Sequence, residues 1–472
     1  MINNINREYP QKTCQCHKKQ LSDTAALKDI SQNVKTNPAK PWTILCYLAA
    51  DVESGFNGQS IEKPMVENVI DMEKVGSNEN MNIIVQLDRG ENPSDISGGW
   101  KGCKRFYIEK NQKNNQNNSI NSNIIKDFGA DGINMAEPKV LEDFILESCK
   151  EYPSDNIMLI LNDHGAGWLG VLEDYSDNNG SMMNIQGIKT AIKNAEEKLG
   201  KKINIIGFDA CVMGQVEVAY ELKGLGEYMI GSQEVIGGKG WPYSKILNKM
   251  NDSIKKSRED KLLNDLSGSE NIVKKIINEC GNLNKEGIPT ISAIKLGQNM
   301  QEQQKFISKV VSACNFPNAL SASEFIAPYL DKFSYLEILK DSFDAFSDAL
   351  IKTGTPDNVI KDIANSSGSF GAVEPFNESK DIVDLANRIN QSSLIMDNDL
   401  KEASREVVEN LNNAVLASQN NKDLYPYANG LSVYFPGKNF LNEYSDTQWS
   451  KNSNWDEALS RFNDVKTDYN NA

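Results

Sequence analysis

The sequence has very little histidine, with only two histidines among 472 residues. So few imidazoles exclude multi-histidine metal centres and histidine relays. Eight cysteines in a chain of this length exclude the dense disulfide framework of a small secreted scaffold. No apolar run approaches the about 18 residues that a membrane-spanning helix needs. We therefore expect no membrane association and no essential metal.

Positive charge is also scarce, because 50 basic side chains stand against 65 acidic ones and leave a net charge of −15. An acidic surface repels phosphate backbones, so we expect no nucleic-acid partner. The hydrophobic share of 39% is enough to build a sizeable core, which excludes disorder throughout the chain. We expect a monomer.

The segment 1–40 is polar and lacks the apolar stretch and small-residue cleavage site of a secretory signal. It is interpreted as an N-terminal arm or pro-segment, and the protein as cytoplasmic, with secretion by a non-classical route left open. Cys14, Cys16 and His17 are either a partial metal site or incidental side chains of a mobile tail. The tail is favoured because two further ligands at zinc spacing are missing.

Residues 41–250 are predicted to form an α/β domain with a mostly parallel central sheet flanked by helices. Short apolar runs bounded by turn residues alternate there with segments of helical spacing, which is typical of βαβ units. The expected strands are 42–50, 81–87, 105–108, 156–161, 203–208 and 228–232, and the expected helices are 61–75, 137–151 and 185–199. Residues 251–472 are predicted to be helix-rich and to contribute strands back to the core, with candidates at 290–296 and 431–435.

Two of these strands end in residues that carry chemistry. The strand at 156–161 leads into Asp163-His164-Gly165, and the strand at 203–208 leads into Asp209-Ala210-Cys211. Ligands of an open parallel sheet bind at the carboxyl ends of its strands. A structural histidine and a buried inert thiol are the alternatives for His164 and Cys211 taken singly.

Together, the imidazole and the thiol are more specific than either alone. Apolar residues at helical spacing after Cys211 predict a helix that begins just after it and stabilises a thiolate. If the two strands are neighbours, His164 and Cys211 face one crevice, as an activated cysteine nucleophile requires. The backbone N–H groups of Gly165 and Cys211 then form an oxyanion hole. This constellation points to acyl transfer, most simply peptide-bond hydrolysis.

The residues that carry this constellation resemble those of a known family. The matching stretches are WTILCYLAAD (42–51), GGWKGCKRFYI (98–108), NMAEPKVLEDFI (134–145), LILNDHGAGW (159–168), IIGFDACVMG (205–214), GSQEVIGGKGWPY (231–243) and NGLSVYFP (429–436). In this order they resemble the clostripain family of cysteine peptidases, the C11 peptidases of clan CD. The paired DHGAGW and FDACVMG segments are the most specific part of the match.

The resemblance implies a caspase-like sandwich and a cysteine endopeptidase that acts on protein or peptide substrates through a thioester. It implies that His164 is the catalytic imidazole and Cys211 the nucleophile. Members of the family cut after Arg or Lys, and Asp209, Ser232 and Lys239 are the expected substrate-binding residues. Some relatives depend on calcium, but no motif here supports a calcium site, and no cofactor is expected.

Two features depart from the family. Lys239 stands where relatives usually carry an acid before the Gly-Trp pair, and a cation there repels a basic P1 side chain by about 1 to 4 kcal/mol. A solvated loop lysine is the alternative. Relatives also mature by self-cleavage after a basic residue between the His and Cys strands, yet residues 165–188 contain no Lys or Arg. Glu173, Asp174 and Asp177 are the acidic alternatives, which leads to the hypothesis of an acidic or neutral P1 preference.

Two further alternatives stay open. Asp163 either orients the imidazole of His164 or ties down its loop. A catalytically silent pseudopeptidase that keeps the caspase fold for binding is the second function considered. Intact His164 and Cys211 count against that second function.

Overall fold

The structure is a computed structural model that describes residues 37–52, 60–111, 118–175, 180–260, 267–298, 300–313, 326, 333–371, 379–436, 439–462 and 465–467. The chain divides into two compact units, Met1–Asn37 and Pro38–Ala472. Cys14, Cys16 and His17 lie outside the described residues. The fold below is that of the second unit.

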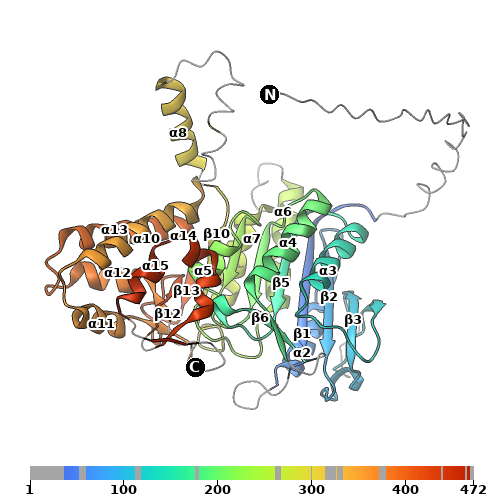
Figure 1. The fold of residues 1–472 in the computed structure, drawn as a ribbon. Coiled ribbons are helices and arrows are strands. Elements are labelled where there is room, and N and C mark those ends of the chain that lie inside the picture. Colours follow the sequence, from blue (N-terminus) through green and yellow to red (C-terminus); the bar gives the residue numbers. More distant parts are fainter. Residues whose placement is uncertain are drawn as a thin grey trace, which may run out of the picture. The chain divides into compact units, whose positions relative to one another are not determined.

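The second unit is built on a nine-stranded sheet (Figure 1). In spatial order its strands are β13 (Val415–Asn420), β10 (Thr290–Lys295), β9 (Tyr228–Gly231), β8 (Ile205–Asp209), β5 (Ser154–Asn162), β1 (Lys40–Ala50), β2 (Met81–Arg89), β3 (Gly102–Tyr107) and β4 (Asn123–Asp127). The five central strands from β9 to β2 pair in parallel, and the strands on both sides pair antiparallel. The expected α/β fold with a parallel central sheet is confirmed.

Strand β1 shows why these apolar runs form buried strands. Successive side chains of a strand point to opposite faces of the sheet. Leu45 and Tyr47 accordingly join one hydrophobic cluster, while Ile44 and Cys46 join the cluster on the other face. The run is apolar without alternation because helices cover both faces.

Helices α3, α4 and α5 cover one face of the sheet, and α2, α6 and α7 cover the other. Their bounds are α2 (Glu62–Met72), α3 (Pro138–Glu151), α4 (Ile185–Leu199), α5 (Val216–Glu221), α6 (Tyr243–Glu259) and α7 (Ser269–Gly281). Local signals define α4 at both ends. The side chain of Asn184 accepts the Gly187 N–H at 2.8 Å, and Gly200 ends the helix with a left-handed φ of 63°.

The later part of the chain is helical and returns strands to the sheet, as expected. Its helices are α8 (Met300–Ala313), α10 (Tyr335–Lys352), α11 (Asp357–Ser366), α12 (Ile382–Gln391), α13 (Asn398–Ala414), α14 (Gln448–Asn452) and α15 (Trp455–Ser460). Smaller sheets join β11 (Ser369–Phe370), β12 (Ser379–Asp381) and β14 (Ser432–Tyr434), and β15 (Asn439–Leu441) with β16 (Val465–Thr467).

The second expected strand of this region takes a different place. The residues around 431–435 form β14 in the three-stranded sheet, while β13, which was not anticipated, occupies the edge of the main sheet. Only the first half of β13, VLA, is apolar, and one of its six residues is buried, so its apolar run is too short to predict a strand. The boundary expected at residue 250 stays a prediction. Helix α6 runs across that position, and the core of α10 and α13 is continuous with that of α3 to α5.

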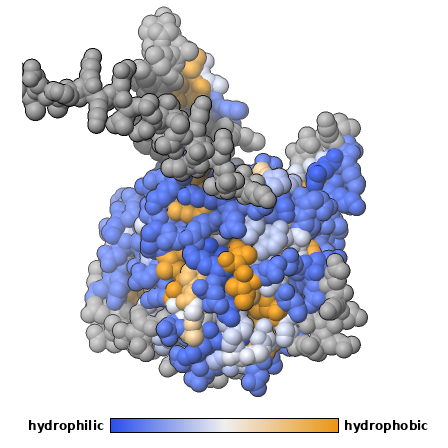
Figure 2. Space-filling model, turned by 90° about the vertical axis from the view of Figure 1, so that its right-hand side faces the viewer, coloured by the Kyte–Doolittle hydropathy of each residue, from blue (hydrophilic) through white to orange (hydrophobic). Residues whose placement is uncertain are grey.

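No helix among the described residues is long and apolar enough to cross a bilayer. The face of the molecule in Figure 2 is mostly hydrophilic and carries only small, separate apolar patches.

The buried indole of Trp449 joins α14 to α5 and α10, because its ring lies 5.3 Å from that of Tyr220 on α5 and 5.1 Å from that of Phe343 on α10. We expect Trp449→Ala to lower the free energy of unfolding by about 3 to 5 kcal/mol, through lost packing and an unfilled cavity. Leu424→Ala, at a side chain that is 65% exposed, is the control and should change it by less than about 0.5 kcal/mol. Urea denaturation measures both, and equal effects would contradict this assignment.

Candidate active site

The two sequence segments that carry chemistry meet at one edge of the sheet. Strands β5 and β8 are parallel neighbours, and Asn162 at the end of β5 pairs with Asp209 at the end of β8. His164 and Cys211 each follow two residues later. The expectation that these two strands are neighbours is confirmed.

The backbones of the two segments touch. A Cβ atom placed on Gly165 would lie 2.3 Å from the carbonyl oxygen of Cys211 and 3.0 Å from its nitrogen. Both distances are too short for a side chain to fit without displacing backbone. Glycine at position 165 is therefore a requirement of this contact.

The thiol of Cys211 is partly buried and lies near three acidic side chains. Burial raises the pKa of Cys211 to about 11, and the negative charges of Asp209, Glu234 and Asp163 act in the same direction. The sulfur lies 3.8 Å from the carbonyl oxygen of Ile236. The thiol is therefore protonated in the resting protein at neutral pH.

The expected helix start directly after Cys211 is wrong. Helix α5 begins only at Val216, and Val212 adopts a positive φ of 53° instead of a helical conformation. The cause is pairing with the segment after β9, since Val212 N–H donates to the Glu234 carbonyl and Gly214 N–H to the Ser232 carbonyl. A helix terminus therefore does not lower the pKa of this thiol.

His164 is half-buried, and its Nε2 atom has no hydrogen-bond partner within the part of the chain that the structure describes. Burial lowers the pKa of His164, while the nearby charge of Glu173 acts against this. The resting imidazole is accordingly neutral, with a ring nitrogen unengaged.

Asp163 bonds to the backbone of the loop. Its carboxylate accepts the N–H of Glu173 on β6 (Val171–Asp174), which pairs with β7 (Ser181–Met183). Its other oxygen is buried without a partner among the described residues, and burial raises the pKa of Asp163 well above its usual range. This contact agrees with the alternative in which Asp163 ties down the loop.

Asp209 lies beneath the site as a buried acceptor. One of its oxygens accepts bonds from the Asn162 amide at 2.9 Å, the Trp241 N–H at 3.0 Å and the Tyr243 hydroxyl at 2.8 Å. Gly240 approaches so closely that a Cβ there would lie 2.5 Å from the same oxygen. The carboxylate thus holds the residues after Lys239 against the end of β8.

The other two residues expected to bind substrate lie in different surroundings. Ser232 is buried, and its hydroxyl lies 2.8 Å from both the Glu234 carbonyl and the Thr290 hydroxyl. Lys239 is exposed on the turn between β9 and α6. The exposure of Lys239 is compatible with both alternatives, a solvated loop lysine and a side chain that meets the substrate, whereas Ser232 presents no free hydroxyl.

Two residues that contribute to the site were not identified from the sequence. Glu234 is buried near Cys211, and its carboxylate accepts the N–H groups of Val235 at 2.7 Å and Gly371 at 3.1 Å. Gln215, which precedes α5, links segments far apart in the chain. The only sequence feature at position 234 is an acidic residue shortly after a predicted apolar strand, and no sequence feature distinguishes position 215.

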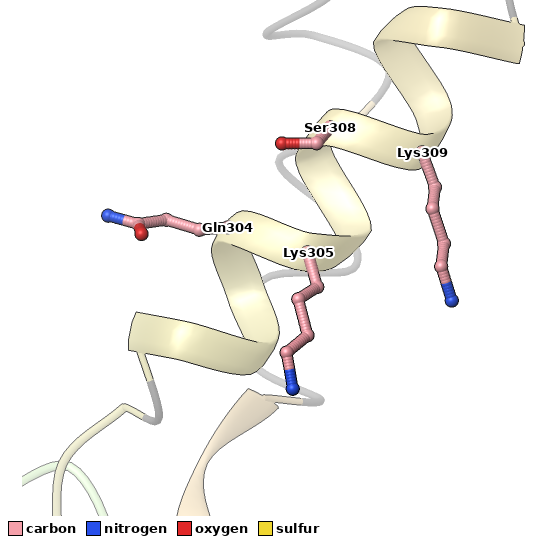
Figure 3. A pocket seen from close by; sticks show the side chains of 4 residues that line it. All are labelled: Gln304, Lys305, Ser308 and Lys309. Atoms are coloured by element: carbon pink, nitrogen blue, oxygen red, sulfur yellow. The ribbon is translucent and has the colours of Figure 1, made fainter.

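Nothing in the described ranges forms a group of three or more His, Cys, Asp or Glu side chains able to hold a metal ion. A shallow depression on α8 is lined by Gln304, Lys305, Ser308 and Lys309. These side chains spread outward from one helix (Figure 3), and none comes from the strand ends that carry His164 and Cys211.

Comparison with known proteins decides the family. The clostripain family model (peptidase C11) matches residues 57–464. The chain belongs to the clostripain family. Clostripain of Hathewaya histolytica is 26% identical over 268 residues, which cover 52% of this chain and 49% of that protein, so the match spans about half of its length.

Solved structures of C11 proteases from two other organisms share the fold. One is a protease of Bacteroides thetaiotaomicron in complex with an irreversible peptide inhibitor, and the other is an inactive zymogen from Parabacteroides distasonis. Each is 19% identical, has a TM-score of 0.55, and covers 88% of this clostripain-family chain and 99% of its own.

Asp209 should make stability depend on pH. An ordinary aspartate has a pKa of about 3.9, and burial raises the pKa of Asp209 to about 6. Its contribution is therefore fully present below about pH 4 and is lost as the pH rises through 6, by about 3 kcal/mol in all. We expect Asp209→Asn to remove this loss, because the amide oxygen can still accept while the side chain no longer ionises.

The measurement is the free energy of unfolding at pH 4 and pH 8 for wild type and Asp209→Asn. Asp423→Asn, at a carboxylate that is 71% exposed, serves as the control. An unchanged pH dependence in Asp209→Asn would show that the carboxyl is not held in its neutral form by burial.

Proposed function

We propose that the protein is a cysteine endopeptidase in which Cys211 is the nucleophile and His164 the general base and acid. The observation that carries the proposal is the contact between the Gly165 and Cys211 backbones at the ends of two parallel strands. It places the imidazole-bearing loop directly beside the thiol-bearing loop. Membership of the clostripain family supports the same reaction.

In the proposed reaction, His164 accepts the thiol proton as the sulfur of Cys211 attacks the scissile carbonyl carbon. The negative charge that develops on the carbonyl oxygen is held by the N–H groups of Gly165 and Cys211. Neither N–H donates a hydrogen bond within the described part of the protein, whereas the N–H groups of Val212 and Gly214 both do. Two free donors side by side are the requirement for an oxyanion hole.

His164 then protonates the leaving amine, which breaks the peptide bond and leaves a thioester on Cys211. Water, deprotonated by the neutral imidazole, attacks the thioester and releases the acid product with the thiol. An unengaged Nε2 suits both steps, because it can receive a proton without first breaking a hydrogen bond.

We further propose that the P1 preference is acidic or neutral. The Asp209 carboxylate already accepts three hydrogen bonds through one oxygen, and burial raises its pKa to about 6. Lys239 is exposed close by in sequence and free to meet a P1 acid. In this proposal a basic P1 side chain is repelled by Lys239, and the carboxylate of Asp209 is already engaged in hydrogen bonds within the protein.

The loop between the two strands supports activity as a single chain. Residues 165–188 contain no Lys or Arg, and Asp174 is fully buried, where its carboxylate accepts the Met135 N–H at 2.8 Å. Glu173 pairs with Met182 in the β6–β7 ladder. Asp177 lies outside the described residues. Cleavage after Glu173 or Asp174 would require this small sheet to open.

Replacement of either member of the dyad should abolish peptide hydrolysis. We expect Cys211→Ala and His164→Ala each to lower kcat/KM by at least about a thousandfold, because no other imidazole of the described chain can substitute. Cys149→Ala, at a cysteine on α3, is the matched control and should retain activity. Absence of turnover in the wild type with a peptide library would instead favour the binding protein of caspase fold.

The P1 preference is tested by charge reversal. We expect the wild type to cleave after acidic or neutral residues, and Lys239→Glu to lower kcat/KM for acidic P1 by about tenfold or more. Lys249→Glu, an equal charge change at an exposed position of α6, is the control. Mass spectrometry of the wild type incubated beside Cys211→Ala reports any self-cleavage site. Cleavage of library peptides only after Arg or Lys would refute the acidic or neutral preference.

A further inference from the structure

Gln215 connects three distant parts of the chain at the site. The side chain is 3% exposed, and both ends of its carboxamide are used. Its oxygen accepts the backbone N–H of Trp168 at 2.8 Å, and its nitrogen donates to the hydroxyl of Ser379 on β12 at 2.8 Å. Trp168 stands four residues after His164, just as Gln215 stands four residues after Cys211.

The loop that carries His164 is packed tightly against this carboxamide. Gly167 has a positive φ of 61°, and a Cβ there would lie 2.4 Å from the Gln215 oxygen. The His164 loop and the Cys211 loop are therefore in close contact at two places, between Gly165 and Cys211 and between Gly167 and Gln215. The histidine loop therefore cannot move toward the cysteine loop, and the bond to Trp168 opposes movement away from it.

The far side of the loop is held by aromatic rings. The Trp168 ring packs edge-on against Tyr434 at 5.3 Å and Tyr444 at 5.1 Å. The backbone of Gln215 also bridges to that of Ser432 on β14, whose N–H donates to the Gly214 carbonyl at 3.0 Å. The carboxamide thus lies between the histidine loop and the small sheet β11–β12–β14.

We propose that Gln215 is a positioning residue that holds the His164 loop at its working distance from Cys211 and braces it on β12. This inference rests on the proposed cysteine-peptidase reaction. A displacement of about 1 Å in a reacting group can cost about a hundredfold in rate. Without the acceptor, the Trp168 N–H is left buried and unsatisfied, and the loop shifts to find another partner or water.

The test compares Gln215→Met, which keeps the volume but removes the acceptor, with Gln215→Glu, which keeps an acceptor at the same place. We expect Gln215→Met to lower kcat at least about tenfold with KM within about twofold. We expect the rate of Cys211 alkylation by iodoacetamide at pH 7 to fall about tenfold, since the neutral imidazole no longer accepts the thiol proton as the sulfur attacks. Gln215→Glu should recover most of the lost kcat.

The matched control is Asn80→Ala. Asn80 is 1% exposed, donates to Asn251 at 2.8 Å and accepts from Arg258 at 2.8 Å, but it lies at the opposite end of the sheet, before β2. Its loss should lower the melting temperature and leave kcat and the alkylation rate at pH 7 unchanged. The proposal is overturned if Gln215→Met lowers only the melting temperature, or if Gln215→Glu is as impaired as Gln215→Met.

Alkylation separates this inference from the proposed function. If the wild type hydrolyses no peptide, the peptidase proposal fails. The alkylation rates of wild type and Gln215→Met at pH 7 still decide whether Gln215 controls the distance between imidazole and thiol.

Discussion

The site depends on one steric constraint, the contact between the backbones of Gly165 and Cys211. It follows from the parallel pairing of β5 with β8, whose last residues Asn162 and Asp209 are in register. Two chain segments that leave adjacent strands at the same level would normally be separated by side chains. Because position 165 has none, the carbonyl and nitrogen of Cys211 lie within a van der Waals contact of the other loop. That approach brings the backbones of the His164 and Cys211 loops into contact.

The electrostatic surroundings favour proton transfer during the reaction over a preformed ion pair. With a thiol pKa of about 11, only about one thiol in ten thousand is ionised at pH 7. The carboxylates of Asp209, Glu234 and Asp163 all oppose the thiolate, and the late start of α5 removes the help of a helix terminus. In the proposed mechanism, His164 must therefore take the proton as the sulfur attacks, which requires the distance between the two groups to be set in advance.

The sequence predicted most of the parallel sheet and the place of the candidate dyad. Apolar runs such as 42–50 and 203–208 report burial on both faces, and burial of that kind has few structural solutions. The same reasoning failed after Cys211, where helical spacing was present but Val212 pairs with Glu234 instead. Local periodicity measures how a segment is buried, not which segment lies against it.

The roles of Gln215 and Glu234 could not be predicted for a related reason, since both depend on partners more than 130 residues away in the chain. Gln215 bonds to Ser379, and Glu234 bonds to the N–H of Gly371. Neither side chain belongs to a pattern, and a lone buried amide or acid has no signature in a single sequence.

These long-range bonds also explain why the helix-rich part belongs to the catalytic unit. Gln233 adds a third link, because its amide donates to Asp381 at 2.9 Å and its oxygen accepts the Gly430 N–H at 2.8 Å. Each buried polar group left without its partner costs about 1 to 3 kcal/mol. A unit that ended near residue 250 would leave the Gln215 nitrogen and both ends of the Gln233 carboxamide without these partners, and would remove one of the two N–H groups that Glu234 accepts. The edge of the sheet that holds the site is therefore completed only by the residues that follow β11, in agreement with a family match that extends to residue 464.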